Sequence, residues 1–117
     1  MIKTCSRGEI YYADLGDGIG SEQKGIRPVV ILQNNTGNKY SPTVIVAPAT
    51  TKTNKKEHLP THFIVCNVDG LYRHSIIMLE QIRTIDKQRL HRYIGSLSEK
   101  QLEELKIPLE ISVGLRE

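Results

Sequence analysis

The sequence predicts a mainly β protein, a small barrel or half-barrel of short strands with one helix at the C-terminal end. Most of the chain consists of short apolar or β-branched segments separated by Gly, Pro, Asn and other turn residues. One of these segments, Val29–Leu32, is apolar without alternation, which is typical of a strand buried on both faces. The C-terminal residues instead carry apolar side chains at helical spacing after a capping motif.

Length and composition indicate one soluble domain. The chain has 117 residues, of which 38% are hydrophobic and 25% charged, as expected for a globular protein with one modest core. No apolar run approaches the roughly 18 residues that span a bilayer, and the first residues lack the apolar segment of a signal peptide. We therefore expect a cytoplasmic protein in which Cys5 and Cys66, which lack metal-ligand spacing, are reduced thiols.

Three strands are expected in the first half of the chain. The segments are Glu9–Asp14, Ile26–Gln33 and Thr43–Thr50. The glycine-rich "LGDGIGSEQKG" forms the first connecting loop, and "NNTGNKYSP" forms a turn. Pro48 has no backbone N–H, so it should confine the late part of the third strand to an edge or a bulge.

The second half should add shorter strands after a long polar loop, "TKTNKKEHLP". We expect strands over Thr61–Val65 and Ser75–Ile85, a helical turn over Asp86–Leu90 and a last strand over Arg92–Leu97.

The final element is predicted to be a helix. Ser98 and Gln101 fit a capping box at its start. A partial apolar stripe comprises Leu97, Leu102, Leu105, Leu109 and Val113. Pro108 lies inside this pattern and should kink the helix or split it near Ile107.

The charge is mildly basic, with a formal net charge of +3. Two groups of basic residues stand out, namely Lys52, Lys55 and Lys56 in one loop, and Arg83, Lys87, Arg89 and Arg92 in another stretch, where Asp86 is the sole acid. Such groups suit a polyanionic partner, although solvated surface is the ordinary alternative.

The sequence disfavours a phosphate-binding loop and a cluster of acidic metal ligands. The segment "GDGIGS" has the glycines of a phosphate loop, but it leads into a strand rather than a helix. We therefore expect a loop that borders a groove. The acids Glu9, Asp14 and Glu22 lack the spacing of a metal cluster, so a nuclease built on this chain should be metal-independent.

The histidines give no ligand pair either. His58 and His62 are four residues apart, but Pro60 between them prevents a regular helix. We expect these two, with His74 and His91, at the surface or at strand edges. The sequence thus predicts no metal site and no cofactor.

The backbone of Arg27 is restricted by the proline that follows it. Pro28 forces it into an extended conformation at the start of a buried strand, where it could serve a structural ion pair or hold an anion. If the two core strands pair antiparallel, the start of one lies beside the end of the other, so Arg27 and Thr50 share a rim. The nearby hydroxyls of Thr51 and Thr53 add to a phosphate-handling arrangement.

Five segments occur in the order and spacing of a known family: "RGEIYYADL", "GSEQKGIRPVVILQN", "NKYSPTVIVAPAT", "LPTHF" and "MLEQIRTIDKQRL". From residue 7 to about residue 115 the chain resembles the MazF/PemK toxins, most nearly the MazF branch of Gram-positive bacteria. These toxins are the ribonuclease halves of bacterial type II toxin–antitoxin pairs.

The resemblance implies a single toxin domain over residues 1–117, with the SH3-like barrel of the CcdB/PemK fold, in a homodimer. It implies sequence-specific cleavage of single-stranded RNA without a metal. By motif, Arg27 and Thr50 correspond to the family's catalytic residues. The residues that correspond to its RNA contacts are Ser21, Glu22, Leu59, Ser75, Glu80 and Gln81.

The expected chemistry suits these residues. The 2′-hydroxyl of RNA attacks the adjacent phosphate, so the protein supplies alignment and charge stabilisation. Arg27 provides a fixed cation and can protonate the leaving 5′-oxygen, and Thr50 donates a hydrogen bond to a non-bridging oxygen. The general base is not assigned. DNA lacks the 2′-hydroxyl and should not be cut.

The resemblance also implies partners and leaves alternatives. An antitoxin with an acidic, disordered C-terminal tail should cover the basic groove, and the strand Ser75–Ile85 with the C-terminal helix offers apolar surface for a dimer. A CcdB-like toxin that binds DNA gyrase is one alternative, since a fold does not fix a function. A catalytically silent RNA-binding or partner-binding domain that uses Tyr11, Tyr12 and the basic loops is another.

Overall fold

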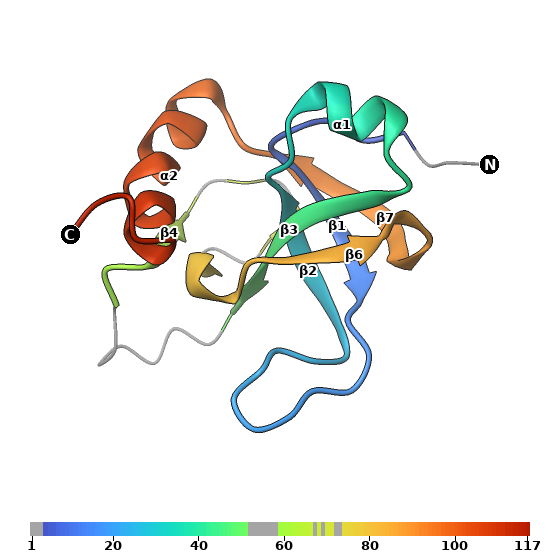
Figure 1. The fold of residues 1–117 in the computed structure, drawn as a ribbon, viewed down its shortest axis with the longest axis horizontal. Helices are drawn as coiled ribbons and strands as arrows, with labels where there is room; N and C mark the ends of the chain where they lie inside the picture. The colour runs from blue at the N-terminus through green and yellow to red at the C-terminus, as the bar shows by residue number, and fades with distance from the viewer. Residues whose placement is uncertain (1–3, 52–58, 67, 69, 72–73) are drawn as a thin grey trace.

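The computed structural model describes residues 4–51, 59–66, 68, 70–71 and 74–117 (Figure 1). Its elements are β1 (Glu9–Asp14), β2 (Ile26–Ile31), α1 (Asn35–Tyr40), β3 (Thr43–Thr50), β4 (His62–Val65), β5 (Ser75–Met78), the 3₁₀ turn η1 (Leu79–Gln81), β6 (Arg83–Asp86), the 3₁₀ turn η2 (Lys87–Arg89), β7 (Leu90–Ser96) and α2 (Glu99–Ser112). The basic loop residues Lys52, Lys55 and Lys56, together with Thr53 and His58, lie outside the described residues.

The strands form one antiparallel, seven-stranded sheet in the order β4-β5-β3-β2-β1-β7, with β6 paired to β3. Among the described residues, no ladder joins β4 to β7, so the sheet is open and has the form of a half-barrel. The helix α2 lies at one end of the molecule, beside β4 (Figure 1). The predicted mainly β fold with a C-terminal helix is confirmed.

The long strand β3 changes partners along its length. Thr43–Val46 pairs with β6, whereas Ala49 and Thr50 pair with β5. Pro48 lies between these two stretches, and its side chain is fully buried. Since proline cannot donate a ladder hydrogen bond, it is tolerated here, where the strand passes from one partner to the next.

Both faces of the central strands are buried. One face carries a cluster formed by Cys5, Tyr11, Ala13, Leu15, Val29, Ile31, Val44, Val46, Ile85 and Leu90. The other face carries a cluster formed by Ile10, Val30, Ala47, Ala49, Val65, Val68, Ile77, Leu79, Leu97 and Leu105. Val29, Val30 and Ile31 have no exposed surface, which confirms the prediction of a strand buried on both faces.

The predicted strand over Ser75–Ile85 is wrong in one respect, because it is two strands separated by η1. Both strands pair with β3, but β5 pairs near its end and β6 near its start. The chain must therefore turn between them. Leu79 anchors this turn in the core, whereas Glu80 is exposed. A continuous run rich in β-branched residues gives no sequence signal for such a turn.

The segment predicted as a turn contains the helix α1. The side chain of Asn34 caps its start by accepting a hydrogen bond from the N–H of Gly37. Asn38 is buried, and its Nδ2 donates to the carbonyl oxygen of Gln33 at 2.9 Å. The buried Lys87 donates from Nζ to the carbonyl oxygen of Asn38. Polar contacts with distant residues therefore stabilise a helix that local propensity does not predict.

The C-terminal helix is a single helix over Glu99–Ser112, so of the kink or split predicted near Ile107 the split is wrong. Its capping box is confirmed, since Ser98 Oγ accepts from the N–H of Gln101 at 3.1 Å and Gln101 Oε1 accepts from the N–H of Ser98 at 2.8 Å. Pro108 packs into the protein with a buried side chain. Neither α2 nor any other helix of the described chain is long and apolar enough to cross a membrane.

Candidate active site and nucleic-acid interface

The register of β2 and β3 places Arg27 and Thr50 at the same rim. The two strands are antiparallel, as predicted, and Val29 pairs with Pro48. Extending this register by two residues on each strand brings Arg27 opposite Thr50. Thr50 is then flanked on its other side by Ile76 of β5.

The side chains of Arg27 and Thr50 also belong to one face. Alternation along β2 puts Arg27 on the face of Val29, and alternation along β3 puts Thr50 on the face of Val46. Val29 and Val46 belong to the same core cluster. The register and the alternation therefore put a cation and a hydroxyl on the same face of two neighbouring strands, where that core meets solvent.

Arg27 is half-buried and held by its own loop. Its Nε donates to the carbonyl oxygen of Lys24 at 3.0 Å, which fixes the guanidinium at the base of the loop between β1 and β2. No carboxylate within the described part of the chain lies at ion-pair distance from Arg27. Of the two sequence alternatives, this geometry favours a cation that can hold an anion over a structural ion pair.

The loop between β1 and β2 is fixed to η1 by the side chain of Gln81. Its Nε2 donates to the carbonyl oxygen of Ser21 at 3.3 Å, and its Oε1 accepts from the N–H of Gln23 at 3.4 Å. Within the loop, Glu22 Oε1 accepts from the N–H of Ile19 at 2.9 Å. Three predicted RNA contacts, Ser21, Glu22 and Gln81, therefore lie together.

Glu80 connects the start of β4 to the same region. Thr61 Oγ1 donates to its Oε1 at 2.8 Å, and His62 Nε2 lies 3.1 Å from its Oε2. The N–H of Leu59 points to His62 Nδ1 at 3.4 Å, so Nδ1 accepts and Nε2 donates to the carboxylate. Glu80 thus fixes the orientation of His62, and the half-exposed Leu59 lies beside this pair through its N–H on His62 Nδ1.

A polar pocket of about 300 Å³ collects several of these side chains. It is lined by Asp17, Glu22, Gln23, Glu80, Gln81, Ile82 and Arg83. Glu, Gln and Arg are among the residues that read base edges through hydrogen bonds. Gln23 was not predicted from the sequence, yet its Oε1 is buried without a hydrogen-bond partner among the described residues. Gln23 follows Ser21 and Glu22 in the segment "GSEQKGIRPVVILQN", but no local pattern in that segment predicts its burial.

Ser75 differs from the other predicted contacts. It begins β5, pairs with Val65 and has no exposed surface. The structure therefore places its backbone near Thr50, since the next residue, Ile76, pairs with Thr50, but it does not present its side chain to solvent.

The described histidines occupy strand edges and the surface. His62 lies on the edge strand β4, and His74 and His91 are exposed. His74 Nδ1 lies 3.5 Å from Cys66 Sγ, and both cysteines are free thiols. Within the described residues, no three His, Cys, Asp or Glu side chains come together as metal ligands.

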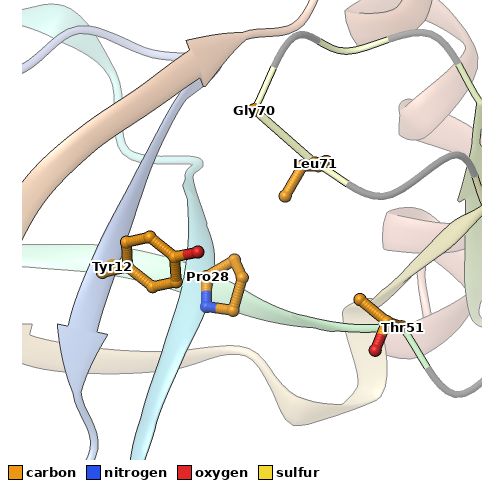
Figure 2. A pocket seen from close by; sticks show the side chains of 5 residues that line it. All are labelled: Tyr12, Pro28, Thr51, Gly70 and Leu71. Atoms are coloured by element: carbon orange, nitrogen blue, oxygen red, sulfur yellow. The ribbon is translucent and has the colours of Figure 1, made fainter.

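A second, more apolar pocket of about 400 Å³ adjoins the rim (Figure 2). Its lining residues are Tyr12, Pro28, Thr51, Gly70 and Leu71. Pro28 and Thr51 directly follow Arg27 and Thr50 in the sequence. Arg92 lies over the ring of Tyr12, with its guanidinium carbon 5.2 Å from the ring centroid.

Comparisons with known proteins agree with the sequence resemblance. Residues 6–113 match the family described as PemK-like, MazF-like toxin of type II toxin–antitoxin system. The chain is 54% identical over 110 residues to Endoribonuclease MazF of Staphylococcus saprophyticus, which covers 93% of this chain and 91% of that relative.

Solved structures show the same fold. The Mycobacterium tuberculosis toxin MazF-mt6 is 27% identical, with a TM-score of 0.74, over 91% of this chain and 96% of that one. A mycobacterial endoribonuclease in complex with its cognate antitoxin is 24% identical, with a TM-score of 0.79, over 97% and 99% of the two chains. The chain therefore belongs to the family of PemK-like, MazF-like toxins of type II toxin–antitoxin systems.

Proposed function

We propose that this protein is a toxin that cleaves single-stranded RNA at a specific sequence and needs no metal ion for catalysis. The observation that carries the proposal is the antiparallel register of β2 and β3. Extended by two residues, it sets Arg27, which has no acidic partner among the described residues, opposite Thr50 at one rim. A fixed cation beside a hydroxyl matches a phosphate in its transition state. The 54% identity to a protein named Endoribonuclease MazF supports the same activity.

The reaction begins when the 2′-hydroxyl attacks the adjacent phosphorus. A bond forms between the 2′-oxygen and phosphorus, the bond to the 5′-oxygen breaks, and the products carry a 2′,3′-cyclic phosphate and a 5′-hydroxyl. Arg27 stabilises the charge on the pentavalent phosphorus and gives a proton to the 5′-oxygen. Thr50 donates a hydrogen bond to a non-bridging oxygen. The 2′-hydroxyl proton leaves to solvent water, and Arg27 regains from solvent the proton that it gave up, so the guanidinium is restored at the end of the reaction.

We assign sequence recognition to the polar pocket beside Gln81. Glu22 and Glu80 can accept hydrogen bonds from the amino groups of bases, and the amide of Gln81 can donate and accept. Ser21, whose carbonyl accepts from Gln81, borders the same region as a backbone contact. Leu59, whose N–H lies on His62, borders it as an apolar contact. Ser75 contributes only if β5 moves, because its side chain is buried in this structure.

An antitoxin and a second copy of the chain are the proposed partners. The net charge of +3 suits an acidic antitoxin tail laid across the rim. Ile64 on the edge strand β4 and Ile107 on α2 are apolar and exposed, which suits a homodimer. Light scattering coupled to gel filtration measures the dimer, and a loss of RNA cleavage on addition of an acidic tail peptide measures inhibition.

The test of the function is cleavage in excess EDTA. The purified protein is mixed with a long single-stranded RNA, a matched DNA and a matched 2′-O-methyl RNA, and the products are sequenced and their ends analysed. The proposal expects cleavage of the unmodified RNA alone, at a recurring short motif, with cyclic-phosphate ends. Intact RNA after incubation with folded, antitoxin-free protein would contradict it, and a gyrase-binding assay would then test the CcdB-like alternative.

A further inference from the structure

We infer that the apolar pocket lined by Tyr12, Pro28, Thr51, Gly70 and Leu71 is a base-binding subsite, in which a nucleobase adjacent to the scissile phosphate stacks on Tyr12. The inference rests on the proposed ribonuclease function and assigns to it a subsite separate from the polar pocket beside Gln81.

The pocket has the size and lining of a ligand site. Its volume of about 400 Å³ lies within the range of small-molecule pockets, which are mostly apolar with a few polar groups. Among the described lining residues, the apolar walls are Tyr12, Pro28 and Leu71, and the hydroxyl of Thr51 is the one side-chain polar group besides the phenol. Figure 2 shows the Tyr12 and Pro28 rings on neighbouring strands, with Leu71 and Thr51 facing them from two other segments.

The position of the pocket ties it to the reacting phosphate. Tyr12 pairs with Pro28, and the next pair along the same ladder joins Ala13 to Arg27. Thr51 is likewise one residue beyond Thr50. Because successive side chains in strands point to opposite faces, the rim presents Arg27 and Thr50 on one face and the pocket on the other. An RNA chain that crosses this rim places a phosphate against the first face and a neighbouring base against the second.

The side chain of Tyr12 is suited to stacking. Single-stranded RNA is bound by aromatic rings and guanidinium planes on which bases stack. Tyr12 is only partly buried, and the guanidinium carbon of the exposed Arg92 lies 5.2 Å from its ring centroid. This cation fixes the ring and adds positive charge beside the pocket, where the RNA backbone approaches. Neither Tyr12 nor Arg92 has a role in the chemistry assigned to Arg27 and Thr50.

The experiment measures binding and cleavage separately. An RNA oligonucleotide carrying the cleavage motif is blocked by a 2′-deoxy substitution at the scissile nucleotide. A set of these oligonucleotides has one abasic nucleotide at each position in turn. Dissociation constants are measured by fluorescence anisotropy for the wild type, Tyr12→Leu and Tyr12→Phe. Tyr40→Ala is the matched control, because Tyr40 is exposed on α1 and also lies under a cation, Lys39.

We expect the effect of Tyr12→Leu on binding to depend on the abasic substitution at one position of the oligonucleotide only. Loss of one stacked base weakens binding about 5- to 100-fold, so Tyr12→Leu should bind the intact oligonucleotide weaker by this factor, and Tyr12→Phe and Tyr40→Ala should bind like the wild type. In the Tyr12→Leu protein, the abasic substitution next to the scissile phosphate should raise the dissociation constant by less than about a further twofold, because the two changes remove the same contact.

Two results would overturn the inference. One is wild-type affinity in a folded Tyr12→Leu protein. The other is that Tyr12→Leu weakens binding by the same factor for every abasic oligonucleotide, whichever base is missing. If the wild-type protein cleaves RNA in either case, only the subsite is wrong. If the wild-type protein cleaves no RNA, the proposed function fails and the subsite fails with it.

Discussion

The side-chain amide of Gln81 donates a hydrogen bond to the backbone carbonyl of Ser21 at 3.3 Å, across a sequence separation of 60 residues. The same amide accepts from the N–H of Gln23 at 3.4 Å. One side chain of η1 therefore satisfies two backbone groups of the loop between β1 and β2. That loop also carries Lys24, whose carbonyl oxygen holds Arg27. The loop is therefore bonded to Gln81 of η1 and to Arg27 of β2.

Replacement of Gln81 should loosen this loop more than it destabilises the protein. In Gln81→Ala both bonds are lost, but they are long and partly exposed, so the free energy of unfolding should fall by about 1 kcal/mol or less. The amides of the loop, above all that of Gln23, should exchange hydrogen at least several-fold faster. Hydrogen–deuterium exchange measures this, with the exposed Gln88→Ala as the control. Unchanged exchange at Gln23 would contradict the account.

Lys87 should matter for stability because it is buried. Its side chain is 2% exposed, and Nζ donates to the carbonyl oxygen of Asn38 in α1. Lys87→Met leaves that carbonyl without its donor, so the free energy of unfolding should fall by about 1–3 kcal/mol. Lys106→Met is the control, because the pair that Lys106 forms with Glu103 is exposed, and its loss should change the free energy of unfolding by about 0.5 kcal/mol or less. Equal effects of the two substitutions in urea titrations would argue against a role for Lys87 in holding α1.

The capping box should stabilise α2 measurably. Ser98→Ala removes the acceptor for the N–H of Gln101 and should lower the free energy of unfolding by about 1 kcal/mol. Ser98→Gly should cost only a few tenths of a kcal/mol, because glycine is tolerated at the N-cap. Urea denaturation distinguishes the two variants, and a Ser98→Gly protein less stable than Ser98→Ala would contradict the assignment.

Tyr11 should make the protein sensitive to alkali. Burial raises the pKa of its phenol above the usual value, and the hydrogen bond to Glu9 at 3.0 Å adds to this effect. In the unfolded chain the phenol ionises near pH 10, so its contribution to stability is complete below about pH 10 and is lost as the pH rises above it. Above pH 10 the wild type should lose up to about 1.4 kcal/mol per pH unit more than Tyr11→Phe.

Urea titrations at several pH values from 9 upward test this difference. Tyr40→Phe, altered at an exposed tyrosine, serves as the control and should follow the wild type. Parallel pH profiles for the wild type and Tyr11→Phe would show that Tyr11 is not the group responsible.

Much of the sheet could be predicted because its signals are local. The unalternating Val29–Leu32 segment predicts a strand buried on both faces, which holds for Val29–Ile31, and the antiparallel pairing of β2 and β3 follows from their succession in the chain. Arg27 and Thr50 could be placed at one rim for the same reason. Ser98 and Gln101 identified the start of α2, since a capping box lies within four residues.

The remaining features depend on contacts between distant segments. The corner at η1 arises because β5 and β6 pair with different parts of β3, which no pattern within Ser75–Ile85 encodes. The helix α1 depends on the buried contact between Asn38 and Lys87, 49 residues apart. The burial of Ser75, and the lack of a hydrogen-bond partner for Gln23 Oε1 among the described residues, are likewise tertiary properties, so neither could be predicted from the sequence.

The central claim is that Arg27 stabilises the reacting phosphate. Its most direct test is the single-turnover rate of RNA cleavage in EDTA, at saturating protein, for the wild type and Arg27→Ala. Arg116→Ala is the control, since Arg116 is exposed and pairs with Glu110 at the C-terminus. Arg27→Lys retains the charge without the planar fork and should be intermediate. The account predicts a rate at least ~10²-fold lower for Arg27→Ala, with a much smaller change in affinity for uncleavable RNA. A folded Arg27→Ala protein that cuts RNA at the wild-type rate would contradict it.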